Sequence, residues 1–92
     1  MSEKRYHVYV SGRVQGVGYR YFTRDVAMSF GLSGWVRNMH DGRVELEVQG
    51  EQSAVDQFLE DLKEGPSLSR VTDLEIEELA PSKSDSEFLI RR

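Results

Sequence analysis

The chain has 92 residues, with 12 Lys or Arg against 16 Asp or Glu, and no cysteine. The length predicts a single domain over residues 1–92, and the absence of cysteine excludes disulfides, thiolate metal sites and a thiol nucleophile. The net charge of −4 argues against general nucleic-acid binding, which requires a basic surface. Because we find no signal-peptide pattern and no apolar run near the roughly 18 residues of a membrane span, we expect a cytoplasmic protein.

Hydrophobic periodicity predicts five strands and two helices. In chain order they are a strand over Arg5–Ser11, a helix over Tyr21–Phe30, a strand over Leu32–Asn38, a strand that contains Arg43–Val48 and ends at Gly50, a helix over Gln52–Glu64, a strand over Arg70–Leu79 and a short last strand over Phe88–Ile90. A turn at Asp41-Gly42 joins the second and third strands. The polar stretch 81–86 is predicted to be a loop.

Both helices are predicted to be amphipathic. The first carries Phe22, Val26 and Phe30 at helical spacing, and these residues are expected in the core. The second carries Val55, Phe58, Leu59 and Leu62 on one face. Its start allows a capping box, with Ser53 and Asp56 as the pair, although the apolar stripe also allows an earlier start.

The order β-α-β-β-α-β with a short extra strand predicts an α+β fold in two layers. The third strand alternates Val44, Leu46 and Val48 with charged residues, which is typical of an antiparallel sheet with one buried face. Both helices should therefore lie on one face of an antiparallel sheet, in a ferredoxin-like sandwich. The place of the last strand in the sheet is left open by the pattern.

A glycine-rich stretch lies between the first strand and the first helix. Gly12, Gly16 and Gly18 allow left-handed backbone conformations, so that several N–H groups can point toward one anion ahead of a helix. Arg20 follows with a planar cation suited to phosphate oxygens. Residues 1–43 hold seven Lys or Arg against three Asp or Glu, while residues 44–92 hold five against thirteen, so the loop lies in the positive half. These features predict an anion-binding site.

The stretch Ser11-Gly-Arg-Val-Gln-Gly-Val-Gly-Tyr-Arg20, followed by Gly34-Trp-Val-Arg-Asn38 and Asp41-Gly42, resembles the acylphosphatase family. The resemblance covers nearly the whole chain. It implies a small hydrolase, without metal or cofactor, that cleaves acyl phosphates to a carboxylate and inorganic phosphate. We separately expect a monomer, although no sequence feature specifies the oligomeric state. It implies that the phosphate binds to a loop formed by Gln15, Gly16, Val17, Gly18, Tyr19 and Arg20. It also implies that Asn38 positions the attacking water. Met39 departs from members that carry a threonine after the asparagine.

The chemistry agrees with these roles. The leaving group is a carboxylate, which needs no general acid, and phosphoryl transfer depends mainly on positioning and charge stabilisation. Asn38 can accept a hydrogen bond from water and donate one through its NH₂ group. The motifs contain no paired carboxylates, no His cluster and no metal-ligand spacing.

Two alternative functions, neither of them enzymatic, stay open. A ferredoxin-like domain can bind RNA through aromatic residues on its central strands, or hold an anion without turnover. Tyr6 and Tyr9 are expected on opposite faces of the first strand, which disfavours an RNA platform. The sequence identifies no pocket for the acyl group.

Overall fold

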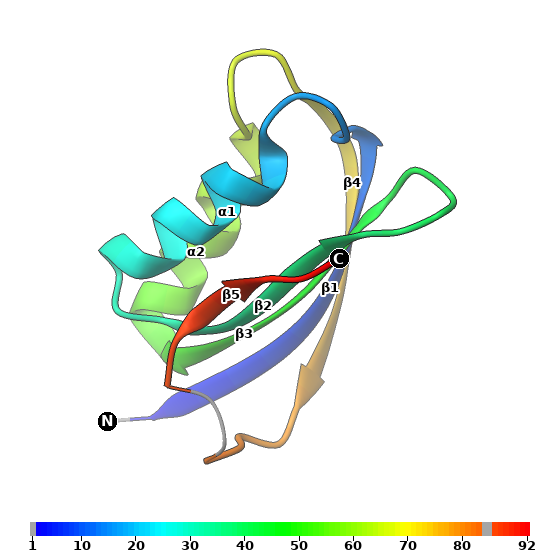
Figure 1. Cartoon of the computed structure of the whole chain (residues 1–92). Coiled ribbons are helices and arrows are strands. Elements are labelled where there is room, and N and C mark those ends of the chain that lie inside the picture. Colours follow the sequence, from blue (N-terminus) through cyan, green and yellow to red (C-terminus); the bar gives the residue numbers. More distant parts are fainter. Residues whose placement is uncertain (1, 84–85) are drawn as a thin grey trace.

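The computed structural model describes residues 2–83 and 86–92, in which two helices cover one face of a five-stranded sheet (Figure 1). The elements are β1 (Glu3–Arg13), α1 (Tyr19–Ser29), β2 (Ser33–Asn38), β3 (Val44–Glu51), α2 (Gln52–Glu64), β4 (Arg70–Leu79) and β5 (Phe88–Ile90). The sheet order is β4-β1-β3-β2-β5. This confirms the predicted two-layer, ferredoxin-like α+β fold. Within the stretch predicted as a loop, residues 84–85 lie outside the described residues.

Four strands pair antiparallel, and β5 joins the edge of β2 in parallel. In the β1–β3 pair, Val8 lies opposite Leu46 and Val10 opposite Val44, and all four side chains are fully buried. The alternation along β3 therefore directs its apolar face toward the helices. β1 runs past its predicted end because its pairing with β4 continues, after a register shift beyond Ser11, to Arg13.

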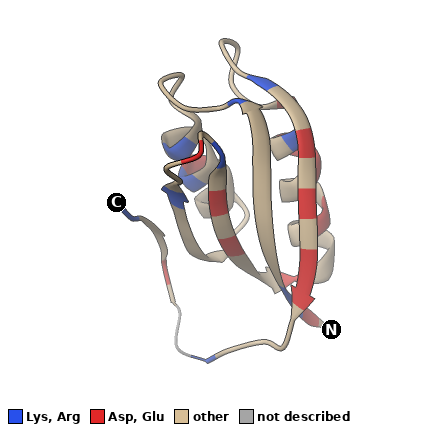
Figure 2. Cartoon of the chain, turned by 90° about the vertical axis from the view of Figure 1, so that its right-hand side faces the viewer, with Lys and Arg blue, Asp and Glu red and all other residues tan. Residues whose placement is uncertain are grey.

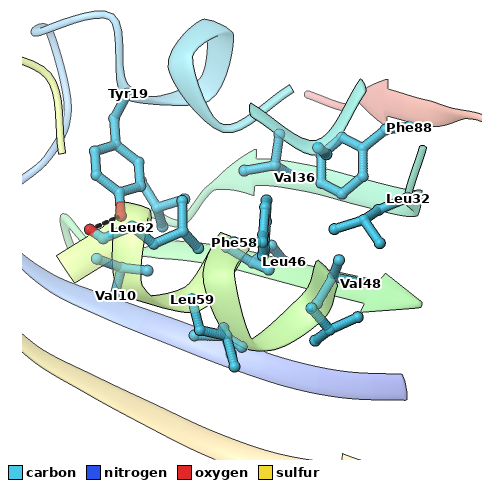
Figure 3. Packing of buried hydrophobic residues seen from close by; sticks show 14 of the residues in the cluster. Val10, Tyr19, Leu32, Val36, Leu46, Val48, Phe58, Leu59, Leu62 and Phe88 are labelled. Atoms are coloured by element: carbon cyan, nitrogen blue, oxygen red, sulfur yellow. Dashed lines mark hydrogen bonds between the residues drawn. The ribbon is translucent and has the colours of Figure 1, made fainter. Parts of the chain in front are cut away.

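The core lies between the sheet and the helices (Figure 3). Its buried members come from both layers: Val8, Val10, Val14, Tyr19, Ala27, Leu32, Val36, Val44, Leu46, Val48, Val55, Phe58, Leu59, Leu62 and Phe88. α2 has its predicted bounds and buries its predicted apolar face. Its predicted capping box is wrong, because the Ser53 hydroxyl donates to the Glu51 carboxylate at 3.1 Å and no side chain caps the helix.

The first helix begins two residues earlier than predicted, at Tyr19. Tyr19, Thr23 and Ala27 form its buried face, and the Tyr19 hydroxyl donates to the Leu62 carbonyl oxygen of α2 at 2.7 Å (Figure 3). This burial raises the pKa of the Tyr19 phenol well above its usual value. The apolar stripe predicted for this helix, Phe22, Val26 and Phe30, is only half-buried and packs along the side of the core. Neither helix is long and apolar enough, within the described residues, to cross a membrane.

The sheet face turned away from the helices carries paired charges. Arg5 Nη2 contacts Glu47 Oε1 at 2.6 Å, and Glu45 is bound by both His7 Nε2 at 2.7 Å and Arg37 Nε at 2.6 Å. Figure 2 shows acidic residues recurring along β3 and along the edge strand β4. Charges on the long edge strand β4 hinder pairing with another chain.

Candidate active site

The loop between β1 and α1 presents a row of backbone amide groups that have no hydrogen-bond partner among the described residues. Gly16 and Gly18 take left-handed conformations, with φ of 74° and 78°, and Gly18 is the N-cap of α1. In the described part of the chain, the backbone N–H groups from Gly16 to Tyr21 donate to no other group, and the next amide, of Phe22, bonds to the Gly18 carbonyl oxygen at 3.0 Å. Unpaired amides at the positive end of a helix dipole form a site for an anion.

Arg20 and Asn38 line the same hollow, which has a volume of about 100 Å³. Arg20 is the second residue of α1, and Asn38 is the last residue of β2. The other lining residues are Val14, Gly16, Gly18, Tyr19 and Tyr21. The sheet and the helix layer thus bring together the two residues to which the resemblance gives the central roles.

Within residues 2–83 and 86–92, both side chains are free of protein partners. Among the described residues, the Arg20 guanidinium makes no ion pair or hydrogen bond, and the Asn38 amide makes no hydrogen bond. Both residues are half-buried. A half-buried, unpaired arginine beside free amides favours an anionic ligand, because the burial of polar groups is costly unless they are hydrogen-bonded.

The six residues predicted to bind phosphate divide into two groups. Gly16, Gly18, Tyr19 and Arg20 line the hollow. The Val17 side chain instead packs against the core. Tyr19 belongs to the helix rather than the loop, and its ring is buried, so it can offer only its backbone to the hollow.

Gln15 connects the loop to the β2–β3 hairpin. Its Nε2 donates to the carbonyl oxygens of Met39 at 2.7 Å and of Arg43 at 2.9 Å. The Gln15 side chain is therefore occupied in fixing the loop beside Asn38. The sequence does not show this role, because the acceptors are backbone carbonyl oxygens and any residue type at positions 39 and 43 would supply them.

Two residues of the hollow, Val14 and Tyr21, were also missed. Tyr21 is the third residue of α1 and lies just beyond the motif Gln15–Arg20 to which the resemblance assigns the phosphate. Across the described residues, no three His, Asp or Glu side chains are grouped as they would be to hold a metal ion.

The chain is similar to known acylphosphatases over nearly its whole length. The sequence profile of the acylphosphatase family matches residues 6–90. The acylphosphatase of Chlorobaculum tepidum is 47% identical over 90 residues, covering 98% of each chain. The acylphosphatase of Bacillus pumilus is 45% identical over 86 residues, covering 94% of this chain and 96% of the relative.

Solved structures agree with the sequence comparison. The crystal structure of acylphosphatase from Bacillus subtilis superposes with a TM-score of 0.93 at 40% identity, covering 97% of this chain and 99% of that one. The structure of an acylphosphatase from Coxiella burnetii gives a TM-score of 0.91 at 39% identity, covering 97% and 93%. The chain belongs to the acylphosphatase family.

Proposed function

We propose that the protein hydrolyses the carboxyl–phosphate bond of acyl phosphates by in-line attack of a water molecule on phosphorus. The products are a carboxylate and inorganic phosphate. The observation that carries the proposal is the hollow in which Arg20, Asn38 and the loop amides meet, all of them without a partner among the described residues. The family membership supports the reaction class.

Arg20 and the amides from Gly16 to Tyr21 bind the phosphoryl group in this proposal. The transition state spreads negative charge over three equatorial oxygens, and fixed N–H donors stabilise that charge without having to reorganise. Arg20 adds a permanent cation whose planar fork matches two oxygens. Gln15 acts as a positioning residue, because its side chain holds the loop against the hairpin.

Asn38 orients the attacking water. Its side-chain oxygen accepts a hydrogen bond from the water, and its NH₂ group is free to donate to a phosphoryl oxygen. The water attacks phosphorus while the bond from phosphorus to the acyl oxygen breaks, so the electron pair leaves with the carboxylate. The water proton passes to the phosphate product or to solvent, and no protein acid is required.

The alternative of an RNA-binding module is less well supported. On the open face of the sheet, Glu45 and Glu47 of β3 are paired with Arg37 and Arg5, whereas acidic residues recur along the edge strand β4 (Figure 2). An RNA backbone would meet repulsion along β4, since the affinity of a protein for RNA depends on phosphate neutralisation. That the protein acts in the cytoplasm, as a monomer, without nucleic acid and without a metal ion, stays a prediction.

Hydrolysis of benzoyl phosphate tests the proposal, measured with EDTA present and with inorganic phosphate as inhibitor. We expect turnover that survives exhaustive chelation and competitive inhibition by phosphate. Phosphate binding without turnover would favour an anion-binding module. Loss of activity in EDTA with rescue by Mg²⁺ or Zn²⁺ would show that the metal-free mechanism is wrong.

A further inference from the structure

The reaction geometry limits where the acyl group can lie. In-line displacement places the attacking water and the leaving oxygen on opposite sides of phosphorus. If Asn38 holds the water, as in the proposed function on which this inference rests, the acyl group points away from Asn38. A larger groove of about 320 Å³, lined in part by Arg37, Met39 and Arg92, adjoins Asn38. An acyl group in that groove would lie on the water side, so the groove does not suit it.

Of the residues that line the hollow, Tyr21 is the one whose side chain can contact the acyl group. Arg20 and the loop amides bind the phosphoryl oxygens, and Asn38 binds the water. Val14 is 1% exposed and the Tyr19 ring lies in the core, so neither can meet a group that extends toward solvent. Tyr21 lines the same hollow and is 57% exposed, which places it at the rim.

The Tyr21 ring is held at this rim by its own helix. Tyr21 stands in the first turn of α1, directly after Arg20. The Arg24 guanidinium, one turn later, lies over the Tyr21 ring at 5.3 Å from its centroid. A cation over the ring face restricts the orientation of the ring while more than half of the residue stays exposed. Within the described residues, Tyr21 is not one of the hydrophobic residues that pack against the core.

We propose that Tyr21 is a specificity residue whose ring contacts the acyl group and favours flat, apolar acyl groups over small ones. An aromatic acyl group, such as benzoyl, can stack on the ring or meet its edge. An acetyl group is too short to cover the ring. The acyl preference of this chain is thus set by the third residue of α1, outside the groups that bind phosphate and water.

The test compares benzoyl phosphate with acetyl phosphate, which share the phosphate and differ in the acyl group. We expect the wild type to have the larger kcat/KM for benzoyl phosphate. In Tyr21→Ala the ratio of the two kcat/KM values should fall about fivefold, the scale of one aromatic contact. Tyr21→Phe should keep the ratio, because the ring suffices.

Met28→Ala is the matched control, since Met28 is a large apolar residue of the same helix and is 62% exposed. It should keep the wild-type ratio. Alanine is the best helix former, so Tyr21→Ala is not expected to unfold α1, and the ratio cancels any loss of folded protein. An unchanged ratio in Tyr21→Ala, or an equal fall in Met28→Ala, would overturn this inference alone. A wild type that hydrolyses neither substrate would overturn the proposed function and this inference with it.

Discussion

The side-chain amide of Gln15 donates a hydrogen bond to the carbonyl oxygen of Met39 at 2.7 Å. The same nitrogen reaches the carbonyl oxygen of Arg43 at 2.9 Å, which also accepts from the Met39 N–H at 2.8 Å. One side chain thus ties the glycine loop to the hairpin immediately after Asn38. The two parts of the proposed active site, one on α1 and its loop and the other on β2, are fixed relative to each other by this contact.

Gln15→Ala should therefore damage both stability and catalysis. Two half-buried hydrogen bonds are lost, and we expect the free energy of unfolding to fall by about 1–2 kcal/mol. A small displacement of the loop relative to Asn38 should lower kcat/KM at least tenfold, because reaction rates depend steeply on the alignment of reacting groups. Gln57→Ala, which loses an exposed hydrogen bond to Asp61, is the control and should change neither quantity. The positioning role is wrong if Gln15→Ala keeps kcat/KM within about twofold of the wild type.

Arg20→Gln should keep the fold and lose phosphate affinity. Arg20 has no protein partner in the described chain, so its replacement breaks no structural contact. A charge-assisted hydrogen bond to an anion contributes about 1.5–3 kcal/mol, so the inhibition constant for inorganic phosphate should rise at least tenfold. Lys4→Gln removes the same charge at the far end of β1 and should leave that constant unchanged. Near-normal phosphate inhibition of Arg20→Gln would disprove the binding role.

The elements with regular periodicity were predictable from the sequence. The helix α2 and the strands β4 and β5 have their predicted bounds because their patterns end at clear breakers or polar stretches. The sequence pattern predicts a start of α1 at Tyr21, two residues late, because the glycine loop hides the change from loop to helix. Gly18 supplies the left-handed cap from its backbone alone, and the first turn carries no capping side chain that the sequence could show.

The candidate site was also predictable only in part, because sequence motifs show some of its residues and not the contacts made between distant elements. Arg20 and Asn38 stand out in the resemblance, and the structure brings them to one hollow. Tyr19 was assigned to the loop because nothing local shows that its ring reaches the Leu62 carbonyl oxygen of α2, a contact between elements far apart in sequence. Contacts to backbone atoms of distant elements depend on the assembled fold and leave no local pattern.

Glu45 should make stability depend on pH. Burial by itself would raise the pKa of this carboxyl, but the hydrogen bonds from His7 and Arg37 outweigh it and hold the pKa below its ordinary value. A carboxyl with a lowered pKa in the folded state stabilises the protein above its unfolded pKa, and that contribution is lost as the pH falls through the folded pKa. Glu45→Gln should therefore lower the free energy of unfolding by about 1–2 kcal/mol at pH 7.

The difference in the free energy of unfolding between the wild type and Glu45→Gln should become smaller as the pH falls below about 4.3, the ordinary pKa of glutamate. Chemical denaturation of both proteins at a series of pH values measures this difference. Glu78→Gln is the control, because Glu78 is exposed and forms a surface ion pair with Lys4. This variant should lower the free energy of unfolding much less than Glu45→Gln does. A difference for Glu45→Gln that persists unchanged to pH 3 would mean that packing, and not the ionised carboxylate, is responsible.

Asn38→Ala should lower turnover and leave phosphate binding nearly unchanged, which would distinguish the positioning of water from the binding of phosphate. If Asn38 acts mainly in the transition state, kcat and kcat/KM fall together while KM stays nearly constant. We expect kcat to fall by about two orders of magnitude or more, the scale of one lost transition-state donor. Phosphate should inhibit this variant almost normally, because Arg20 and the loop amides are intact.

Asn38→Asp sharpens the contrast, because its carboxylate still accepts a hydrogen bond from water but lacks the NH₂ donor. It also places a negative charge in a hollow of about 100 Å³ that must admit a phosphate dianion. We expect this variant to be inactive and to bind phosphate more weakly than Asn38→Ala. If Asn38 served only the turn before Asp41-Gly42, both variants would lose thermal stability and keep nearly full turnover per folded molecule. Because the Asn38 amide has no partner in the described chain, its loss should cost little stability, and kcat corrected for the folded fraction decides between the two roles.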